Sequence, residues 1–496
     1  MDAFLPLAKA IHVAVAPYAA QFSYVFDLLT PLKFRALHAV VDSMASPGVP
    51  ADVLRYMMCL FGAYPIALFF PLIPSPILKH VFTTGVGIFF AQFVFGSSWV
   101  HTLVMAIMTY GIVLAAPRRH IGTIAFFWNM GYLSLSHIYR MYVDYMGVTL
   151  EISGAQMVLC MKLTSFAFNY YDGVVDSERI KNPPADNKAL AKVFATRRAL
   201  AINQLPSVIE YLGYVYCFPT LLAGPSFEFR EYVDVTNGTK IVGPGRVKAG
   251  LSKLAVGLFY CGIMSTGAPY FPFTNFYSED VAVLPWYQQI ATLYVTFFLF
   301  KCRFYGCWTV AEGATVLSGF GYEGQADDGS PRWNGVQYMN VWEFELASCH
   351  RDSTRKWNRI TQGWLEKYIY TRTNNSLTAT YFVSAFWHGF YPGYYLFFML
   401  MPLPTLVNRA AHKRLRPWFL EADGSEGTKK RIYDIVGSVA NALGIHYIAF
   451  PFITLGWDNS IQGYINLKFS GHIILVVLWV IFSFIPVRKD IKTKHE

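Results

Sequence analysis

The sequence predicts an all-α protein, a polytopic bundle of about eleven helices that cross a membrane. The chain of 496 residues is 54% hydrophobic and 17% aromatic. Only 15% of its residues are charged, whereas soluble domains carry roughly 25%. The apolar residues also fall into runs of about 20, the length that a helix needs to cross a bilayer. A soluble core does not need this much apolar surface, but helices that face lipid do.

Ten apolar runs are long enough to span the membrane. They lie at roughly 53–73, 77–96, 98–116, 120–140, 206–224, 248–268, 283–304, 376–400, 433–455 and 463–486. The stretch 151–170 carries a polar face, and we expect a tilted or re-entrant helix there. Between Gly306 and Ser376, aromatic residues interleave with charges, which is typical of amphipathic helices at the membrane interface.

The two ends of the chain carry patterns that predict its cellular location. Residues 1–30 lack the pattern of a cleavable signal peptide, so Ala8 to Phe26 is expected to form a first or interfacial helix. The chain ends Lys492-Thr493-Lys494-His495-Glu496, with the lysine spacing of a dilysine retrieval signal. The alternative is a solvated basic tail. Two spans separate this tail from the basic loop 411–432, so both can face the cytosol. These features predict a multi-pass protein of the endoplasmic reticulum membrane.

Charge and cysteine usage narrow the class further. The net charge of +10 falls in short loops and forms no tract of the nucleic-acid-binding kind, so no nucleic acid partner is expected. The seven cysteines are scattered without the Cys/His spacing of a zinc site, and no metal is expected. No repeat or linker divides the chain, which predicts one domain over residues 1–496. Its parts would be N-terminal helices (1–150), a core (151–400), and C-terminal helices with a cytosolic tail (401–496).

One histidine is the first candidate for chemistry. His388 lies near the centre of the run 376–400, which contains no Asp, Glu, Lys or Arg. A continuous helix over this run would place His388 near the midplane of the membrane, where ionisable groups are costly and tend to be functional. The neighbouring Gly389 permits close approach of backbone or ligand. Thirty residues upstream, Asn358 lies in a polar, basic stretch.

These two residue types suit acyl transfer to an alcohol. A neutral imidazole in a water-poor setting can accept a proton from a hydroxyl and return it to a leaving group. The carboxamide of Asn358 can donate to a developing oxyanion or orient a carbonyl, and it is less costly to bury than a cation. The structural alternatives are a packed histidine bonded to a carbonyl and an asparagine that bridges helices.

The sequence around both residues resembles the membrane-bound O-acyltransferase (MBOAT) family. The segment Ser384-Ala385-Phe386-Trp387-His388-Gly389 follows Trp357-Asn358-Arg359 and Trp364-Leu365 at the family's distance. Further blocks resemble its lysophospholipid acyltransferase branch: Lys162 to Ala167 with Tyr171-Asp172-Gly173, Leu222-Ala223-Gly224-Pro225, and Trp308 with Ala311-Glu312. These blocks occur in the family's order over about residues 160–400, the central half of the chain.

The resemblance implies a fold, a reaction and a pair of catalytic residues. The fold is a helix bundle with the acyltransferase core at 151–400 and a reaction tunnel through the membrane. The implied enzyme moves a fatty acyl group from acyl-CoA to the free hydroxyl of a lysophospholipid and so remakes a phospholipid. His388 would be the general base, and Asn358 would orient or stabilise the thioester carbonyl. Acyl-CoA is then a co-substrate, entering from the cytosol, and no cofactor is required.

Residues near these two acquire expected binding roles. The cations Arg351, Arg355, Lys356 and Arg359 are candidates for the phosphates of CoA, and interfacial snorkelling is the alternative for each. Trp357, Trp364 and Trp387 are candidates to line the acyl or adenine path, with ordinary packing as the alternative.

Other functions stay open at this point. Sterols, diacylglycerol or a protein could be the acceptor of an acyltransferase of this kind. A secondary transporter has a similar polytopic architecture, although transporters commonly show two related halves, which this sequence lacks. Oligomeric state is not encoded in any pattern visible here.

Overall fold

The computed structural model describes residues 34–46, 48–147, 149–182, 187–240, 242–421 and 423–488. Within these ranges the chain is helical and has no β-strand, only the isolated bridges Ser46–Val49 and Gln325–Pro331. The predicted all-α class is therefore confirmed. The helix expected at Ala8–Phe26 and the C-terminal lysines lie outside the described residues.

The helices group into two compact units. The first unit comprises Met1–Phe259, Gly306–Tyr338 and Gly363–Thr380. The second comprises Tyr260–Tyr305, Met339–Gln362 and Tyr381–Glu496. Four of the five boundaries fall inside helices: α13 (Arg246–Gly267), α15 (Trp286–Leu317), α18 (Arg359–Tyr368) and α19 (Leu377–His388). The fifth, between Tyr338 and Met339, falls in the loop before α16.

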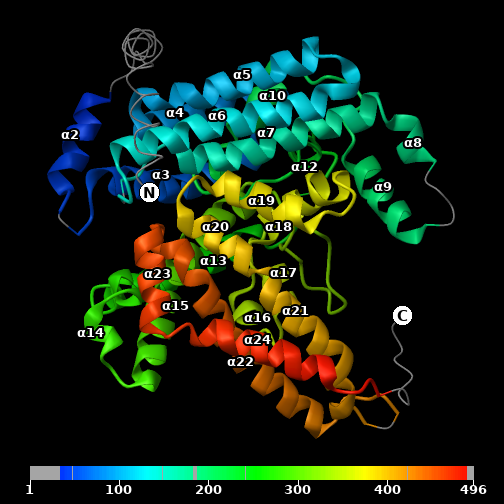
Figure 1. The fold of residues 1–496 in the computed structure, drawn as a ribbon. Helices are drawn as coiled ribbons and strands as arrows, with labels where there is room; N and C mark the ends of the chain where they lie inside the picture. The colour runs from blue at the N-terminus through cyan, green and yellow to red at the C-terminus, as the bar shows by residue number, and fades with distance from the viewer. Residues whose placement is uncertain are drawn as a thin grey trace. The chain divides into compact units, whose positions relative to one another are not determined.

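The first unit is built around long helices that pack side by side. Its elements are α2 (Arg35–Met44), α3 (Ala51–Phe69), η1 (Phe70–Leu72), α4 (Pro76–Phe95), η2 (Gly96–Trp99), α5 (Val100–Ala115), η3 (Arg118–His120), α6 (Ile121–Val143), α7 (Ser153–Val174), α8 (Ser177–Lys181), α9 (Lys188–Leu200), α10 (Val208–Val215), α11 (Phe218–Leu221), α12 (Phe229–Thr236) and η5 (Tyr370–Arg372). Helix α7 packs along α6 and against α5, and α4 packs against α10 and α11 (Figure 1).

A lysine at the centre of this unit ties α7 to the end of α10. Lys162 is 1% exposed. Its Nζ donates to the carbonyl oxygens of Tyr214 at 2.5 Å and Val215 at 3.3 Å, and to Thr220 Oγ1 at 3.3 Å. These carbonyls belong to the last residues of α10, where the helix dipole is negative and backbone acceptors lack intrahelical donors. The amino group therefore caps α10 from a neighbouring helix.

The second unit has shorter helices arranged around α22. Its elements are η4 (Phe273–Phe276), α14 (Glu279–Ala282), α16 (Val341–Glu345), α17 (His350–Lys356), α20 (Pro392–Leu400), α21 (Pro402–Ala410), the π-turn η6 (Ala411–Leu415), η7 (Arg416–Phe419), α22 (Thr428–Thr454), α23 (Trp457–Asn466) and α24 (Ser470–Phe484).

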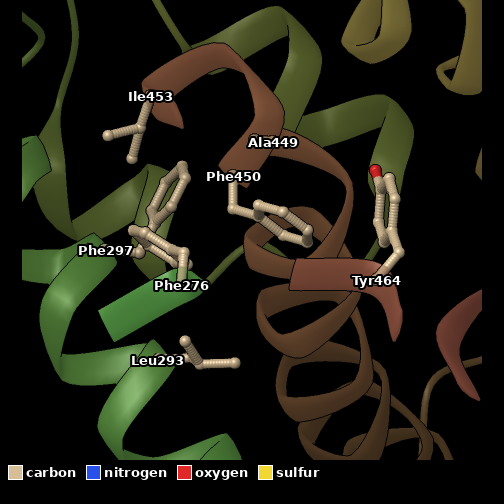
Figure 2. Close-up of a cluster of buried hydrophobic side chains, with 7 residues drawn as sticks. All are labelled: Phe276, Leu293, Phe297, Ala449, Phe450, Ile453 and Tyr464. Atoms are coloured by element: carbon tan, nitrogen blue, oxygen red, sulfur yellow. The ribbon is translucent and has the colours of Figure 1, made fainter. Parts of the chain in front are cut away.

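Aromatic rings hold the core of the second unit together. The buried cluster consists of Phe276, Leu293, Phe297, Ala449, Phe450, Ile453 and Tyr464 (Figure 2). The ring of Phe276 stacks on that of Phe450 with 5.5 Å between centroids, and Tyr464 approaches the other side of Phe450 at 4.6 Å. Three separate stretches of chain, η4, α22 and α23, are joined in this way. Burial of such large side chains is worth about 1.5–3 kcal/mol each, so the cluster anchors α22.

The membrane-spanning pattern agrees in part with the prediction. Among the described residues, four helical segments are long and apolar enough to span: Ala51–Leu72, Pro76–Ala115, Arg246–Gly267 and Thr428–Thr454. The pair formed by α23 and α24, bent by 69°, is a fifth candidate if it counts as one span. The chain thus has several apolar helices, and the number of about eleven stays a prediction.

The apolar run 376–400 differs from the expected single helix. Helix α19 has 12 residues and α20 has 9, with a break between His388 and Pro392. At 1.5 Å per residue they are about 18 Å and about 14 Å long, so neither crosses a bilayer alone. The expectation that His388 lies at the middle of a continuous helix is therefore wrong. Glycine and proline within the run end one helix and begin the next, and hydropathy alone does not register this.

The link from Lys162 to α10 can be tested by thermal unfolding in detergent. We expect Lys162→Met to lower the free energy of unfolding by about 2–4 kcal/mol, because each buried carbonyl left without a donor costs about 1–3 kcal/mol. Lys181→Met is the control, since the Lys181 side chain is 59% exposed and pairs only with Glu178 on α8. Equal melting temperatures for the two variants would contradict the capping role.

Candidate functional site

The local sequence places His388 at the very end of a helix. It is the last residue of α19, and Gly389 follows with φ 119°, a conformation that favours glycine. The N–H of Gly389 donates to the carbonyls of Ala385 and Phe386, both at 3.2 Å, and so satisfies the end of α19. Pro392 then begins α20, where its missing N–H costs nothing. His388 therefore lies where α19 ends, just before the break that leads to α20.

Aromatic rings surround the imidazole of His388. The ring of Trp387 lies edge-on with its centroid 4.7 Å away, and Phe452 of α22 lies edge-on at 4.8 Å. Phe398 is nearly parallel at 5.8 Å, and Tyr394 is tilted at 5.5 Å. His388 itself is half-buried. The imidazole thus lies among aromatic rings from α19, α20 and α22, and the neutral form of an imidazole is the one that can accept a proton.

A close backbone contact joins the start of α20 to the end of α22. The N–H of Gly393 donates to the carbonyl of Leu455 at 2.7 Å. A Cβ at position 393 would lie 2.0 Å from the carbonyl oxygen of Pro451, so only glycine fits. This contact holds the start of α20 against the end of α22. The ring centroids of Tyr394 and Phe452 are 4.7 Å apart.

Asn358 also occupies a break between helices. It lies between α17 and α18 with φ 42°, in the left-handed region that asparagine tolerates better than most residues. Its side-chain Oδ1 accepts from the N–H of Thr361 at 3.1 Å and so caps the first turn of α18. Capping uses the acceptor half of the carboxamide and fixes its orientation. The donor half is the one required to stabilise an oxyanion.

The four predicted phosphate-binding cations share one short segment. Arg351, Arg355 and Lys356 are on α17, and Arg359 begins α18. Arg351, Arg355 and Arg359 are exposed, and no ion pair involves any of the four within the described ranges.

Helix α17 is attached to its unit through its other face. Its Ser353 is buried, and Ser353 Oγ accepts from Asn441 Nδ2 of α22 at 2.6 Å. Exposed, unpaired guanidinium groups remain able to bind an anion.

The three predicted tryptophans lie in different surroundings. Trp387 is 5% exposed and packs on His388. The ring of Trp357 joins Phe304, Tyr305 and Phe344, the last at 5.1 Å, in the second unit. Trp364 belongs to the first unit, is 3% exposed, and donates from Nε1 to Thr164 Oγ1 at 3.0 Å. Trp364 is thus held by packing and a hydrogen bond, whereas Trp387 directly contacts the candidate base.

A neighbouring cysteine and histidine do not form a nucleophilic pair in this structure. Burial lowers the pKa of His350 to about 4 and raises the pKa of the adjacent Cys349 thiol. Neither ring nitrogen of His350 has a hydrogen-bond partner within the described part of the chain. The Cys349 thiol bonds to the side chain of Asp352 and not to an imidazole, and a thiol with a raised pKa is poorly suited to attack a thioester.

Two groups of residues were not predicted from the sequence. The first is the enclosure of His388 by Tyr394, Phe398 and Phe452, because an aromatic residue in an apolar run gives no separate signal. The second is a cavity in the first unit whose cations come from α9 and from the segment 363–375. The sequence predicts only that basic residues fall in short loops.

The chain is similar in sequence to proteins of one family. The model of the membrane-bound O-acyltransferase family matches residues 137–449. The chain is 31% identical over 467 residues to membrane-bound glycerophospholipid O-acyltransferase 1 of Mus musculus, covering 89% of this chain and 91% of that protein. It is 29% identical over 472 residues to the lysophospholipid acyltransferase of Schizosaccharomyces pombe, with coverage of 90% and 89%. For the Saccharomyces cerevisiae protein of the same name, identity is 30% over 470 residues, with coverage of 88% and 74%.

The matched region contains His388 and Asn358, whereas Phe452 of the aromatic enclosure lies beyond its end. Several helices of the chain are long and apolar enough to cross a membrane. The chain therefore belongs to the membrane-bound O-acyltransferase family and is a multi-pass membrane acyltransferase.

Proposed function

We propose that this protein transfers a fatty acyl group from acyl-CoA to the free hydroxyl of a lysophospholipid. The observation that carries the proposal is the half-buried imidazole of His388, held at the end of α19 by aromatic rings from α19, α20 and α22. The names of the relatives, lysophospholipid and glycerophospholipid acyltransferases, support the choice of acceptor.

The proposed reaction is a single direct transfer. His388 accepts the proton of the lysophospholipid hydroxyl as its oxygen attacks the thioester carbonyl of acyl-CoA. The tetrahedral oxyanion receives a hydrogen bond from Asn358 Nδ2, whose orientation the α18 cap sets. Collapse of this intermediate breaks the carbon–sulfur bond, and the imidazolium returns its proton to the departing CoA thiolate. The products are a phospholipid and CoA, and the enzyme regains its neutral imidazole.

The architecture proposed for this reaction is a bundle of about eleven membrane helices around a tunnel in the endoplasmic reticulum membrane. Acyl-CoA would enter from the cytosol and the lysophospholipid from the bilayer. Arg351, Arg355, Lys356 and Arg359 are proposed to attract the phosphates of CoA, and Trp357, Trp364 and Trp387 to border the acyl or adenine path.

The function is tested with purified protein in detergent. A panel of lysophospholipids is assayed against several acyl-CoAs, with a sterol and diacylglycerol as alternative acceptors. We expect esterification of at least one lysophospholipid and none of the other acceptors. Acylation of a sterol or diacylglycerol alone would change the acceptor class, and no acyl transfer under any condition would favour a transporter.

His388→Ala should abolish turnover while the protein remains folded and membrane-inserted. Loss of a general base costs about 10²–10⁴-fold in rate. His472→Ala is the matched control, because His472 is also in an apolar helix of the second unit but bonds to Tyr447 instead. The measurement is the initial rate at saturating substrates, with thermal unfolding to check the fold. A His388→Ala variant that keeps more than about a tenth of wild-type activity would remove His388 from the role of base.

Asn358→Asp separates the catalytic role of Asn358 from its structural role. Aspartate tolerates the left-handed backbone and still caps α18, but it has no N–H to donate. We expect Asn358→Asp to keep the melting temperature near that of wild type and to lower kcat by about 10²–10³-fold. Asn358→Ala should lower both kcat and stability, because it also loses the cap. A normal kcat for Asn358→Asp with a raised KM for acyl-CoA would make Asn358 a binding residue.

Direct transfer predicts intersecting initial-rate plots and an active Cys349→Ala variant. The raised pKa of the Cys349 thiol argues against an acyl-enzyme, and so does the absence of a hydrogen bond from His350 to it in the described part of the chain. The measurement is a two-substrate initial-rate series with wild-type protein and the variant. Parallel plots, or labelled acyl group retained on the protein in the absence of acceptor, would refute the mechanism.

A further inference from the structure

A buried ion pair lies in the second unit, close to the segment that carries Asn358. Lys301 of α15 is 2% exposed, and its Nζ lies 2.6 Å from Oε1 of Glu345, the last residue of α16. The stretch before it, 281–300, contains no Asp, Glu, Lys or Arg. An ammonium group in such apolar surroundings is costly unless a carboxylate compensates its charge. The pair therefore fixes the end of α16 to one point on α15.

Tyr305 strengthens this attachment from the next turn of α15. Its side chain is fully buried, and its phenol donates to the same Glu345 Oε1 at 2.6 Å. Residues four apart lie on one face of a helix, so the amine of Lys301 and the phenol of Tyr305 reach the carboxylate together. Lys301, Glu345 and Tyr305 are called the α15–α16 triad below.

The triad is in contact with the ring of Trp357 through two aromatic rings. Phe344, which precedes Glu345 on α16, has its ring 5.1 Å from that of Trp357 and 5.2 Å from the Nζ of Lys301. The ring of Tyr305 lies edge-on to that of Trp357 at 6.2 Å. One of these rings comes from α15 and the other from α16, so the bonds of the triad fix both of them relative to each other.

Trp357 precedes the backbone position with unfavourable geometry in the candidate site. Asn358 has φ 42°, and left-handed backbone costs free energy at any residue other than glycine. Such a conformation persists only where the surrounding contacts impose it. Trp357 is the residue at which α17 ends, so a fixed Trp357 ring sets the direction in which the chain enters Asn358. The direction of the chain in turn sets the direction of the carboxamide.

Stability alone does not explain an ion pair at this place. Apolar residues of similar volume often replace a buried pair without loss of stability. A pair with a shared hydrogen-bond acceptor differs from apolar packing because its donors must lie at a defined distance and angle from one oxygen. The triad therefore supplies a precise position for α16 relative to α15.

We propose that the α15–α16 triad positions the carboxamide of Asn358, acting through Phe344 and Trp357. The inference rests on the proposed function for the catalytic role of Asn358. It adds to that role the buried polar group that holds the left-handed turn in place. All of these residues belong to the second unit.

A double-mutant cycle tests whether the triad acts through Asn358. Lys301→Met/Glu345→Gln removes both charges and leaves no unpaired ion. We expect this double variant to lower kcat about tenfold, with both KM values within about twofold, since residues joined by contacts commonly couple at this level. In the Asn358→Asp background the same change should lower kcat less than about twofold. Lys430→Met/Asp434→Asn is the matched control and should keep the wild-type kcat, because this ion pair lies at the start of α22.

Tyr305→Phe keeps the test decisive if the double variant does not fold. It retains the ring beside Trp357 and removes only the hydrogen bond to Glu345. We expect kcat to fall about threefold with Asn358 present and to stay unchanged in the Asn358→Asp background. An equal loss of kcat in both backgrounds would overturn the proposal, because a smaller folded fraction lowers activity whatever residue stands at position 358.

Hydrogen exchange separates this proposal from the proposed function. The N–H of Thr361 donates to Asn358 Oδ1, and its exchange is measured by mass spectrometry on the full chain in detergent, without substrate. We expect exchange at Thr361 to be about tenfold faster in the double variant of the triad and unchanged in the control pair. Faster exchange together with a normal kcat for Asn358→Asp would support positioning by the triad and remove Asn358 from catalysis. Unchanged exchange at Thr361 in the double variant would overturn the proposal.

Discussion

The requirement that every buried backbone group find a hydrogen-bond partner shapes the candidate active site. A helix that stops inside an apolar run exposes carbonyls and N–H groups that lipid cannot satisfy. At Gly389 the N–H folds back onto the carbonyls of α19, and at Gly393 the N–H reaches the carbonyl of Leu455 on α22. Because these bonds complete the backbone, the chain can turn sharply at His388, and the imidazole stands at the turn instead of along the side of a helix.

Asn358 and Lys162 also provide hydrogen-bond partners for backbone groups at helix ends. Asn358 satisfies the first turn of α18 with its side-chain oxygen, and Lys162 satisfies the last turn of α10 from another helix. In each case a polar side chain replaces solvent at a helix end. The two side chains differ in their remaining hydrogen-bonding groups. The Asn358 cap uses only the oxygen of the carboxamide, so its N–H groups are not used by the cap. All the described contacts of the Lys162 amino group are to protein acceptors. The contacts of Lys162 therefore stabilise the fold, and the donor half of Asn358 is the part that the proposed reaction uses.

The aromatic enclosure of His388 connects packing with reactivity. Phe452 is on α22, and the buried cluster of Phe276, Phe450 and Tyr464 anchors that helix (Figure 2). The position of the ring against which the imidazole rests is therefore set by contacts on the opposite side of α22. Apolar surroundings protect a thioester from hydrolysis, so under the proposed function the same rings would serve both the packing of the unit and the reaction.

The sequence by itself determined the helical class and the membrane family, and it predicts His388 and Asn358 as the residues for acyl transfer. Composition and run length reveal lipid-facing helices, and the ordered motifs around Asn358 and His388 reveal the family. Only the tertiary structure decided that the run 376–400 is two helices, because hydropathy does not distinguish a continuous helix from a broken one when Gly389 and Pro392 are themselves compatible with an apolar environment. It also brought Phe452 to His388 and gathered Lys192, Arg197 and Arg372 around one cavity. These residues are far apart along the chain, and their proximity depends on helix packing that no local pattern encodes.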